Sequence, residues 1–116
     1  MHICLMYQKE FLKGTIKTVL LCLLDEHTEM YGYEITQLVK VRSENEINLT
    51  EGALYPALHK LEANGLVDTF VKKVDGRNRK YYQLTTLGSK EASKAKKGWL
   101  QFNNLIGNVI NSFNHA

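Results

Sequence analysis

A short helix followed at once by a hairpin, within residues 50–88, constrains the fold of this chain more than any other segment. Thr50 is a favourable N-cap for the helix, which then carries leucines at helical spacing. Two β-rich runs follow at 66–74 and 80–85, and the sequence Asp-Gly-Arg-Asn between them is a strong hairpin signal. The chain is therefore expected to set a helix beside a two-stranded hairpin whose tip is strongly basic.

Two further helices are expected ahead of this segment. Residues 9–26 place apolar side chains at helical spacing, and Leu21 and Cys22 widen the apolar face, so this helix should be buried on most sides. Residues 31–40 form a shorter helix with a narrow apolar stripe. Three helices followed by a hairpin is the order of a winged helix-turn-helix. The predicted fold class is mainly α (α+β), with a winged helix-turn-helix domain at 9–85.

A long helix is predicted to close the chain, from Thr86 to about Phe113, and residues 86–113 are expected to form a dimerisation helix. Small or apolar residues recur along it in steps of three and four, which makes one continuous seam. The seam either packs on the first helix of the same chain or pairs two copies. Pairing is favoured, because so small a core cannot cover a seam of this length. The residues expected at the dimer interface are Trp99, Phe102, Ile106, Val109 and Phe113.

Positive charge is concentrated in the hairpin. The net charge of +3 is by itself weak support for a nucleic-acid partner. Residues 71–80, however, carry five Lys or Arg against one acid, whereas residues 41–70 carry two against five. Cations on a projecting hairpin suit phosphates or a minor groove, while the lysines at 90–97 are interpreted as a solvated face. The hairpin residues expected to contact double-stranded DNA are Lys72, Lys73, Arg77, Asn78, Arg79 and Lys80.

The helix that begins at Thr50 is the candidate recognition element. With its leucines inward, its outer face is small and nearly uncharged near the N-terminus, where backbone N–H groups can approach phosphates or base edges. No Arg, Asn or Gln on that face can read a base bidentately, so shape and methyl contacts should dominate. The residues expected to contact DNA here are Thr50, Gly52, Ala53, Tyr55, Pro56, His59 and Lys60, together with Tyr33 from the preceding helix.

Tyrosines and a proline in this region carry separate expectations. Tyr55 is open to two interpretations, a DNA contact or a half-buried packing residue. Pro56 removes one backbone hydrogen bond from the helix and should bend it. Tyr81 and Tyr82 point to opposite faces of the hairpin, so one should pack in the core and the other should be exposed or contact a partner.

Nothing in the chain indicates catalysis, a cofactor or a metal site. The four histidines are scattered, and no catalytic or phosphate-binding motif occurs. Cys4 and Cys22 lie in apolar surroundings without metal-ligand spacing or a secretory context, which argues against a disulfide framework or a zinc site. No apolar run approaches the roughly 20 residues of a membrane span. We expect a cytoplasmic protein that is not an enzyme, needs no cofactor and has no membrane partner.

Trp99 is the only tryptophan and lies on the C-terminal seam. The simplest interpretation is an aromatic residue of the core or the dimer interface. In a symmetric dimer, however, Trp99 and its mate could face each other and form a flat slot for a planar ligand. A sensor of a small apolar or aromatic effector is therefore an alternative function.

Three motifs carry a resemblance to a known family. They are YGYEI at 31–35, EGALYPALHKLE at 51–62 and GRNRKYYQLT at 76–85, and they occur together in this order. The chain resembles the PadR family of bacterial transcriptional regulators, in its short subclass with a single C-terminal helix. The resemblance covers about residues 9–113.

The resemblance implies a homodimeric winged-helix repressor that binds a pseudo-palindromic operator and is released by a small-molecule or stress signal. Ala53 stands where the family usually has Thr, which removes a hydroxyl from the recognition helix. Trp99 falls where multidrug-responsive relatives place a drug-stacking tryptophan. A protein-interaction adaptor that kept the fold but lost DNA affinity is the remaining alternative.

Overall fold

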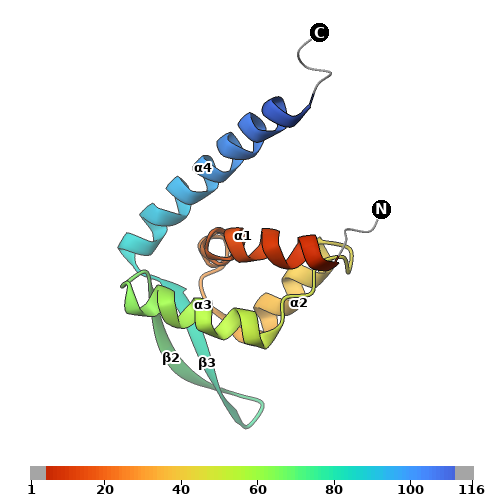
Figure 1. The fold of residues 1–116 in the computed structure, drawn as a ribbon. Coiled ribbons are helices and arrows are strands. Elements are labelled where there is room, and N and C mark those ends of the chain that lie inside the picture. Colours follow the sequence, from red (N-terminus) through yellow and green to blue (C-terminus); the bar gives the residue numbers. More distant parts are fainter. Residues whose placement is uncertain (1–4, 112–116) are drawn as a thin grey trace.

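The computed structural model describes residues 5–111, and within them the chain forms a mainly α fold with a small antiparallel sheet (Figure 1). Its elements, in chain order, are α1 (Leu5–Glu26), β1 (Met30–Tyr31), α2 (Gly32–Arg42), α3 (Glu51–Ala63), β2 (Val67–Val74), β3 (Arg77–Leu84) and α4 (Thr86–Ile110). The predicted winged helix-turn-helix is confirmed. The β2–β3 hairpin is called the wing below. None of the helices in the described part of the chain is long and apolar enough to cross a membrane.

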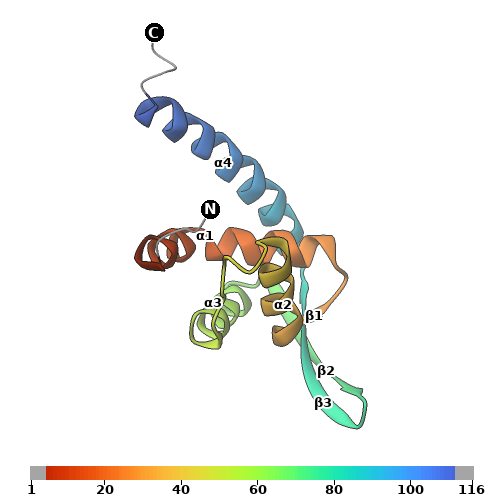
Figure 2. The same ribbon diagram turned by 90° about the vertical axis from the view of Figure 1, so that its right-hand side faces the viewer.

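The core lies where α1, α2 and α3 meet the base of the wing (Figure 2). Its fully buried large side chains come from all of these elements: Leu20, Leu21, Ile35, Leu54, Leu58, Val67 and Tyr82. The start of α4 crosses the base of the wing at Gly88, where an added Cβ would lie 1.9 Å from the backbone oxygen of Leu66. Only a glycine allows this approach, which fixes the origin of α4 against the wing.

Helix α1 begins four residues before its predicted start at residue 9. The inward face continues to Gln8, which lies one helical turn before Leu12 and is buried. The Gln8 side-chain amide donates a hydrogen bond to the backbone oxygen of Glu46, which ties α1 to the segment ahead of α3. Because this buried residue is polar, it interrupts the hydrophobic pattern, and hydrophobic periodicity therefore predicted too late a start for the helix.

The hairpin turn is tighter than the predicted Asp-Gly-Arg-Asn turn. Asp75 and Gly76 alone connect the strands, with φ of 51° and 76°, as a two-residue turn with both φ positive requires. Arg77 and Asn78 are therefore strand residues, registered with Val74 and Lys73. The two-residue strand β1, too short to show periodicity, was not predicted; it pairs with β3 and gives the sheet order β1-β3-β2.

Both tyrosines of the wing are buried, so of the two possibilities predicted for the second tyrosine, exposure or a partner contact, exposure was wrong. Tyr82 is in the core, and Tyr81 on the opposite face of the sheet is only 7% exposed. The Tyr81 ring stacks on Phe70 at 5.6 Å and meets Tyr31 edge-on at 5.3 Å between centroids. Tyr31 comes from strand β1, which was not predicted, so the sequence did not indicate what covers this face of the hairpin.

Helix α4 starts on the body of the molecule and then runs away from it (Figures 1 and 2). The Thr85 hydroxyl caps it, accepting from the Gly88 N–H at 3.0 Å. Ala92 is buried and Ala95 half-buried against the core, whereas the seam from Trp99 onward is exposed. The first part of the seam thus packs within the chain, whereas residues 5–111 leave the second part exposed.

Candidate nucleic-acid interface

Helix α3 has the amphipathic form expected of the recognition element. The Thr50 hydroxyl accepts the Ala53 N–H at 3.3 Å and so caps the helix. Pro56 lies inside α3, which continues to Ala63; the carbonyl that loses its helical donor is that of Gly52, at the exposed start of the helix. The predicted contact residues that are exposed on α3 are Gly52, Pro56, His59 and Lys60.

Tyr55 and Ala53 are less accessible than the other predicted contact residues of α3. Both are half-buried against the core. The Tyr55 ring lies against Gly32, the first residue of α2, where an added Cβ would be 2.4 Å from the Tyr55 hydroxyl oxygen. This contact supports the packing interpretation of Tyr55. Tyr33, by contrast, is 61% exposed at the N-terminus of α2.

A methyl group at position 32 should therefore force Tyr55 out of its site. We expect Gly32→Ala to reduce the free energy of unfolding by about 1–3 kcal/mol, because the close contact leaves no room for the methyl carbon. Gly14→Ala is the matched control, since nothing lies within 4 Å of a Cβ in the middle of α1, and it should be neutral or stabilising by up to about 1 kcal/mol. Urea denaturation of both variants measures the difference; equal stability would show that Tyr55 is not held by this contact.

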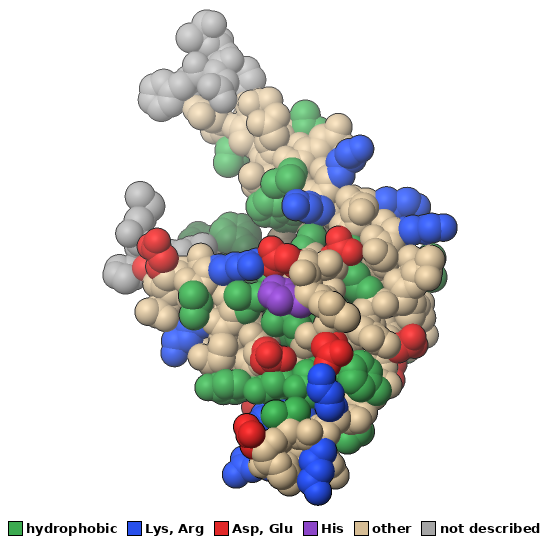
Figure 3. Space-filling view, turned by 180° about the vertical axis from the view of Figure 1, so that it is seen from behind, with side chains coloured by type: hydrophobic (Ala, Val, Ile, Leu, Met, Phe, Trp, Pro, Cys, Tyr) green, Lys and Arg blue, Asp and Glu red, His purple; other side chains and the backbone are tan. Residues whose placement is uncertain are grey.

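The strand register divides the side chains of the wing between two faces, because alternate residues point to opposite sides of a sheet. The α3 face carries Thr69, Val71, Lys73, Asn78, Lys80 and Tyr82. The outer face carries Phe70, Lys72, Arg77, Arg79 and Tyr81. The predicted basic tip is thus two separate sets of cations, and several basic side chains are visible on the face of the wing at the bottom of Figure 3.

Three of the five wing cations are already held by the protein. On the outer face, Lys72 is paired with Glu29, and its Nζ lies 4.7 Å from the Tyr81 ring centroid. The hydrogen bond to Glu29 raises the pKa of Lys72 above its ordinary value. The Arg79 guanidinium lies 4.5 Å from the Tyr31 ring centroid. On the α3 face, Lys80 lies 3.9 Å from a carboxylate oxygen of Glu62.

Lys73 and Arg77 differ from these three. Both side chains are exposed beside the turn, and no ion pair or ring contact holds either of them within residues 5–111. Asn78, opposite Lys73 in the register, is also exposed. The end of the wing therefore presents two cations that an external anion can engage at no cost in lost intramolecular pairs.

A second surface is apolar and runs along α4. From Trp99 to the end of α4, the exposed large hydrophobic side chains are Trp99, Leu100, Phe102, Leu105, Ile106, Val109 and Ile110. Phe113, also predicted at the dimer interface, lies outside the described residues. On α1, Tyr7 and Phe11 are exposed and stack on each other at 6.1 Å.

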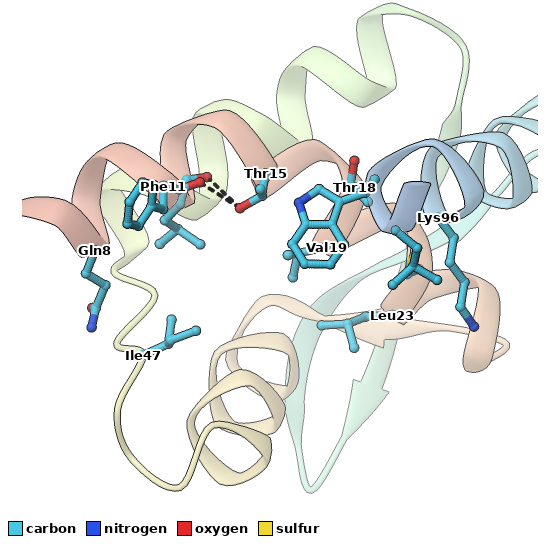
Figure 4. Close-up of a pocket in the computed structure, with 12 residues that line it drawn as sticks. Gln8, Phe11, Thr15, Thr18, Val19, Leu23, Ile47 and Lys96 are labelled. Atoms are coloured by element: carbon cyan, nitrogen blue, oxygen red, sulfur yellow. Dashed lines mark hydrogen bonds between the residues drawn. The ribbon is translucent and has the colours of Figure 1, made fainter. Parts of the chain in front are cut away.

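A cavity of about 470 Å³ opens between α1 and α4 (Figure 4). Its walls include Phe11, Leu12 and Val19 of α1 and Trp99 and Leu100 of α4, so they are almost wholly apolar.

This combination of helix, wing and C-terminal helix has counterparts among known proteins. A family model described as the transcriptional regulator PadR-like family matches residues 20–94, more than half of the chain. The chain belongs to this family of PadR-like regulators. Members of the family are transcriptional regulators and not enzymes; they bind DNA and are typically dimeric.

Curated relatives of this PadR-like chain are distant. An uncharacterised protein from Lysinibacillus sphaericus is 31% identical over 102 residues, which is 87% of this chain and 93% of that protein. A transcriptional regulator from Mycobacterium tuberculosis is 40% identical over 60 residues, a match that spans 52% of this chain and 53% of that protein.

Solved structures show the same architecture. A transcriptional regulator from Clostridium thermocellum superposes with a TM-score of 0.79 at 26% identity, covering 88% of this PadR-like chain and 99% of that one. A PadR-like regulator from Bacillus cereus gives a TM-score of 0.73 at 25% identity, with 88% and 97% covered.

Sequence reasoning missed the residues of the PadR-like chain that hold the wing cations. Glu29 lies 43 residues before Lys72, and Tyr31 lies in a strand that was not predicted. Glu62 lies on the predicted recognition helix, and its spacing from Lys80 along the chain does not indicate that the two side chains meet. Each contact depends on tertiary packing, and no local pattern in the sequence indicates it.

Proposed function

We propose that this PadR-like chain is a cytoplasmic, homodimeric repressor that binds a pseudo-palindromic operator and is released by a small-molecule or stress signal. Residues 9–85 are the DNA-binding domain, and residues 86–113 are the dimerisation segment, whose helix α4 ends at Ile110. In each half-site α3 enters the major groove and the wing reaches the neighbouring minor groove.

The observation that carries the proposal is the position of Lys73 and Arg77. They project, exposed and unpaired within residues 5–111, from the end of a wing that stands beside the exposed face of α3. Free cations at that place can neutralise phosphates and release counterions. The exposed α3 residues carry little charge, so this helix supplies fit and register while the wing supplies electrostatic affinity.

The other DNA contacts follow from the same placement. The N-terminus of α3, with its cap Thr50 and the exposed Gly52, faces a phosphate or base edge, and Tyr33 reaches the backbone from the start of α2. His59 and Lys60 extend the contact toward the end of α3. Tyr55 and Ala53 act mainly by shaping this surface, since both are half-buried.

Binding to the DNA upstream of the protein's own gene tests the proposal. Fluorescence anisotropy with short duplexes tiled through that region should reveal one bound at least about 10³-fold more tightly than a scrambled duplex at equal salt. Equal binding to all duplexes would contradict operator recognition. No binding at all would favour the alternative of a protein-interaction adaptor.

A second candidate function is supported by the cavity between α1 and α4. Trp99 lies in its wall and is itself 40% exposed, so a planar apolar molecule can stack on the indole. Such a molecule would be the effector that releases the repressor from DNA.

Fluorescence of Trp99 reports directly on such binding, because it is the only tryptophan. We expect a planar aromatic dye such as ethidium, added without DNA, to quench the emission in a saturable manner. Gly14→Ala, on the same helix but not among the residues that line the cavity, should leave the dissociation constant unchanged, whereas Val19→Gln should raise it about tenfold by placing an amide in the apolar wall. Linear, non-saturable quenching would count against a ligand site.

A further inference from the structure

Two carboxylates contact the wing from its opposite faces. Glu62 of α3 reaches the α3 face, and Glu29, just ahead of β1, reaches the outer face. Each engages one lysine of the wing, Lys80 in the first case and Lys72 in the second. The wing is thus the one element with an ion pair to the body on both of its sides, among the pairs formed within residues 5–111.

Glu62 connects the recognition helix to both strands of the wing. One of its carboxylate oxygens accepts from the Thr69 hydroxyl on β2 at 3.1 Å, and the other lies 3.9 Å from Lys80 on β3. Lys80 also lies 5.5 Å from the ring centroid of Tyr82, whose side chain is in the core. Glu62 therefore adds polar contacts with both strands to the apolar packing that already joins α3 to the base of the wing.

Glu29 makes the corresponding contact on the outer face. Its carboxylate is hydrogen-bonded to Lys72, whose ammonium group also faces the Tyr81 ring. Beside this pair, Arg79 covers Tyr31. The outer face is therefore bound to β1 and to the loop before it through charge and aromatic contacts together.

Carboxylates beside a phosphate-binding surface weaken DNA binding by simple electrostatics, so their presence needs a reason. We propose that Glu29 and Glu62 are positioning residues, which hold the wing in the direction that matches the operator and keep two of its lysines from binding phosphates indiscriminately. This inference rests on the proposed function. It makes the two acids determinants of specificity, because they lower affinity for other DNA more than affinity for the operator.

Glu29→Gln and Glu62→Gln test the inference, since glutamine keeps the shape and removes the charge. Each variant should bind a scrambled duplex about three- to sixfold more tightly and with a salt slope steeper by about 0.9, because one lysine becomes available to phosphate. The preferred duplex of the tiled set should gain less affinity, so the ratio of preferred to scrambled affinity should fall about three- to tenfold.

Asp68→Asn is the matched control, because it removes an exposed charge from the same hairpin at a residue with no ion pair within residues 5–111. It should strengthen binding to both duplexes equally.

If the ratio of preferred to scrambled affinity stays at the wild-type value in both glutamine variants, as expected for Asp68→Asn, the inference is overturned. The two acids would then lower DNA affinity only through their charge. A DNA-free measurement separates this result from a failure of the proposed function. Amide hydrogen exchange across residues 70–80 should become about two- to fivefold faster in both variants and also in Lys72→Gln and Lys80→Gln, which break the same pairs from the other side. If the wild type prefers no duplex, the repressor proposal fails. If hydrogen exchange is unchanged in all four variants, Glu29 and Glu62 do not hold the wing, and the inference fails whatever the DNA result.

Discussion

Replacing Lys73 and Arg77 together by alanine should weaken DNA binding about thirtyfold at about 0.15 M salt and flatten the slope of log affinity against log salt by about 1.8. Each phosphate contact releases close to one counterion, so each lost contact lowers affinity by about five- to sixfold at that salt concentration. Both side chains are exposed and make no ion pair within residues 5–111, so their removal should leave the protomer intact. Anisotropy titrations over a range of salt concentrations measure both quantities.

Lys90→Ala combined with Lys94→Ala is the matched control for this pair. It removes the same two charges from exposed positions on α4, a helix that starts at the base of the wing and not at its turn (Figure 1), and should leave the salt slope unchanged. Equal slopes for the wild type and the Lys73/Arg77 variant would refute the assignment of the end of the wing to DNA.

The structure also ranks the remaining wing cations. Lys72, Arg79 and Lys80 are engaged with Glu29, Tyr31 and Glu62, so each must leave or share a partner before it can bind a phosphate. Alanine at any one of them should flatten the slope by less than the value of about 0.9 expected for a full phosphate contact. The sequence treats the five cations alike, whereas the fold distinguishes them.

The elements that were predictable from sequence are those with strong local signals. The Thr50 cap, the hairpin between the two β-rich runs and the helical spacing of leucines each depend on residues within a few positions of one another. The structure has all of them, although the hairpin turn is two residues shorter than predicted. Strand β1 was not predictable in this way, because two residues carry no period. Without β1, the outer face of the hairpin was expected to be open, whereas in the structure Tyr31 of that strand packs against Tyr81 there.

The sequence indicates which residues belong to the candidate site, but not which faces they occupy or which residues they contact. Alternation along the strands assigns the wing cations to two faces once the register is known, and the register depends on a turn that was expected to be two residues longer. The half-buried state of Tyr55 follows from its approach to Gly32, a contact across 23 positions between two helices. Such contacts arise only when the elements are packed.

The second large effect concerns the seam of α4. Phe102→Glu combined with Ile106→Glu should convert the protein to a monomer and lower affinity for the preferred duplex by at least about 100-fold, because the two half-sites would no longer be bound as one unit. The two side chains lie one helical turn apart on the seam, are exposed in the protomer and belong to the part of α4 that runs away from the body. Glutamate favours helix and is hydrated there at little cost, but two carboxylates facing their mates in a dimer would be buried without partners.

Gln101→Glu combined with Asn104→Glu controls for the added charge, since these exposed residues lie on the opposite side of the same helix. Sedimentation equilibrium should show a dimer for the wild type and this control, and a monomer for the seam variant.

If the seam variant remained a dimer, the interface would lie elsewhere, and the apolar stripe of α4 would be unexplained. A monomer that still bound the preferred duplex with wild-type affinity would separate dimerisation from DNA binding, and the operator would then consist of a single half-site. Loss of both together is the outcome we expect, since each protomer carries one recognition helix and one wing, and therefore the contacts for half an operator.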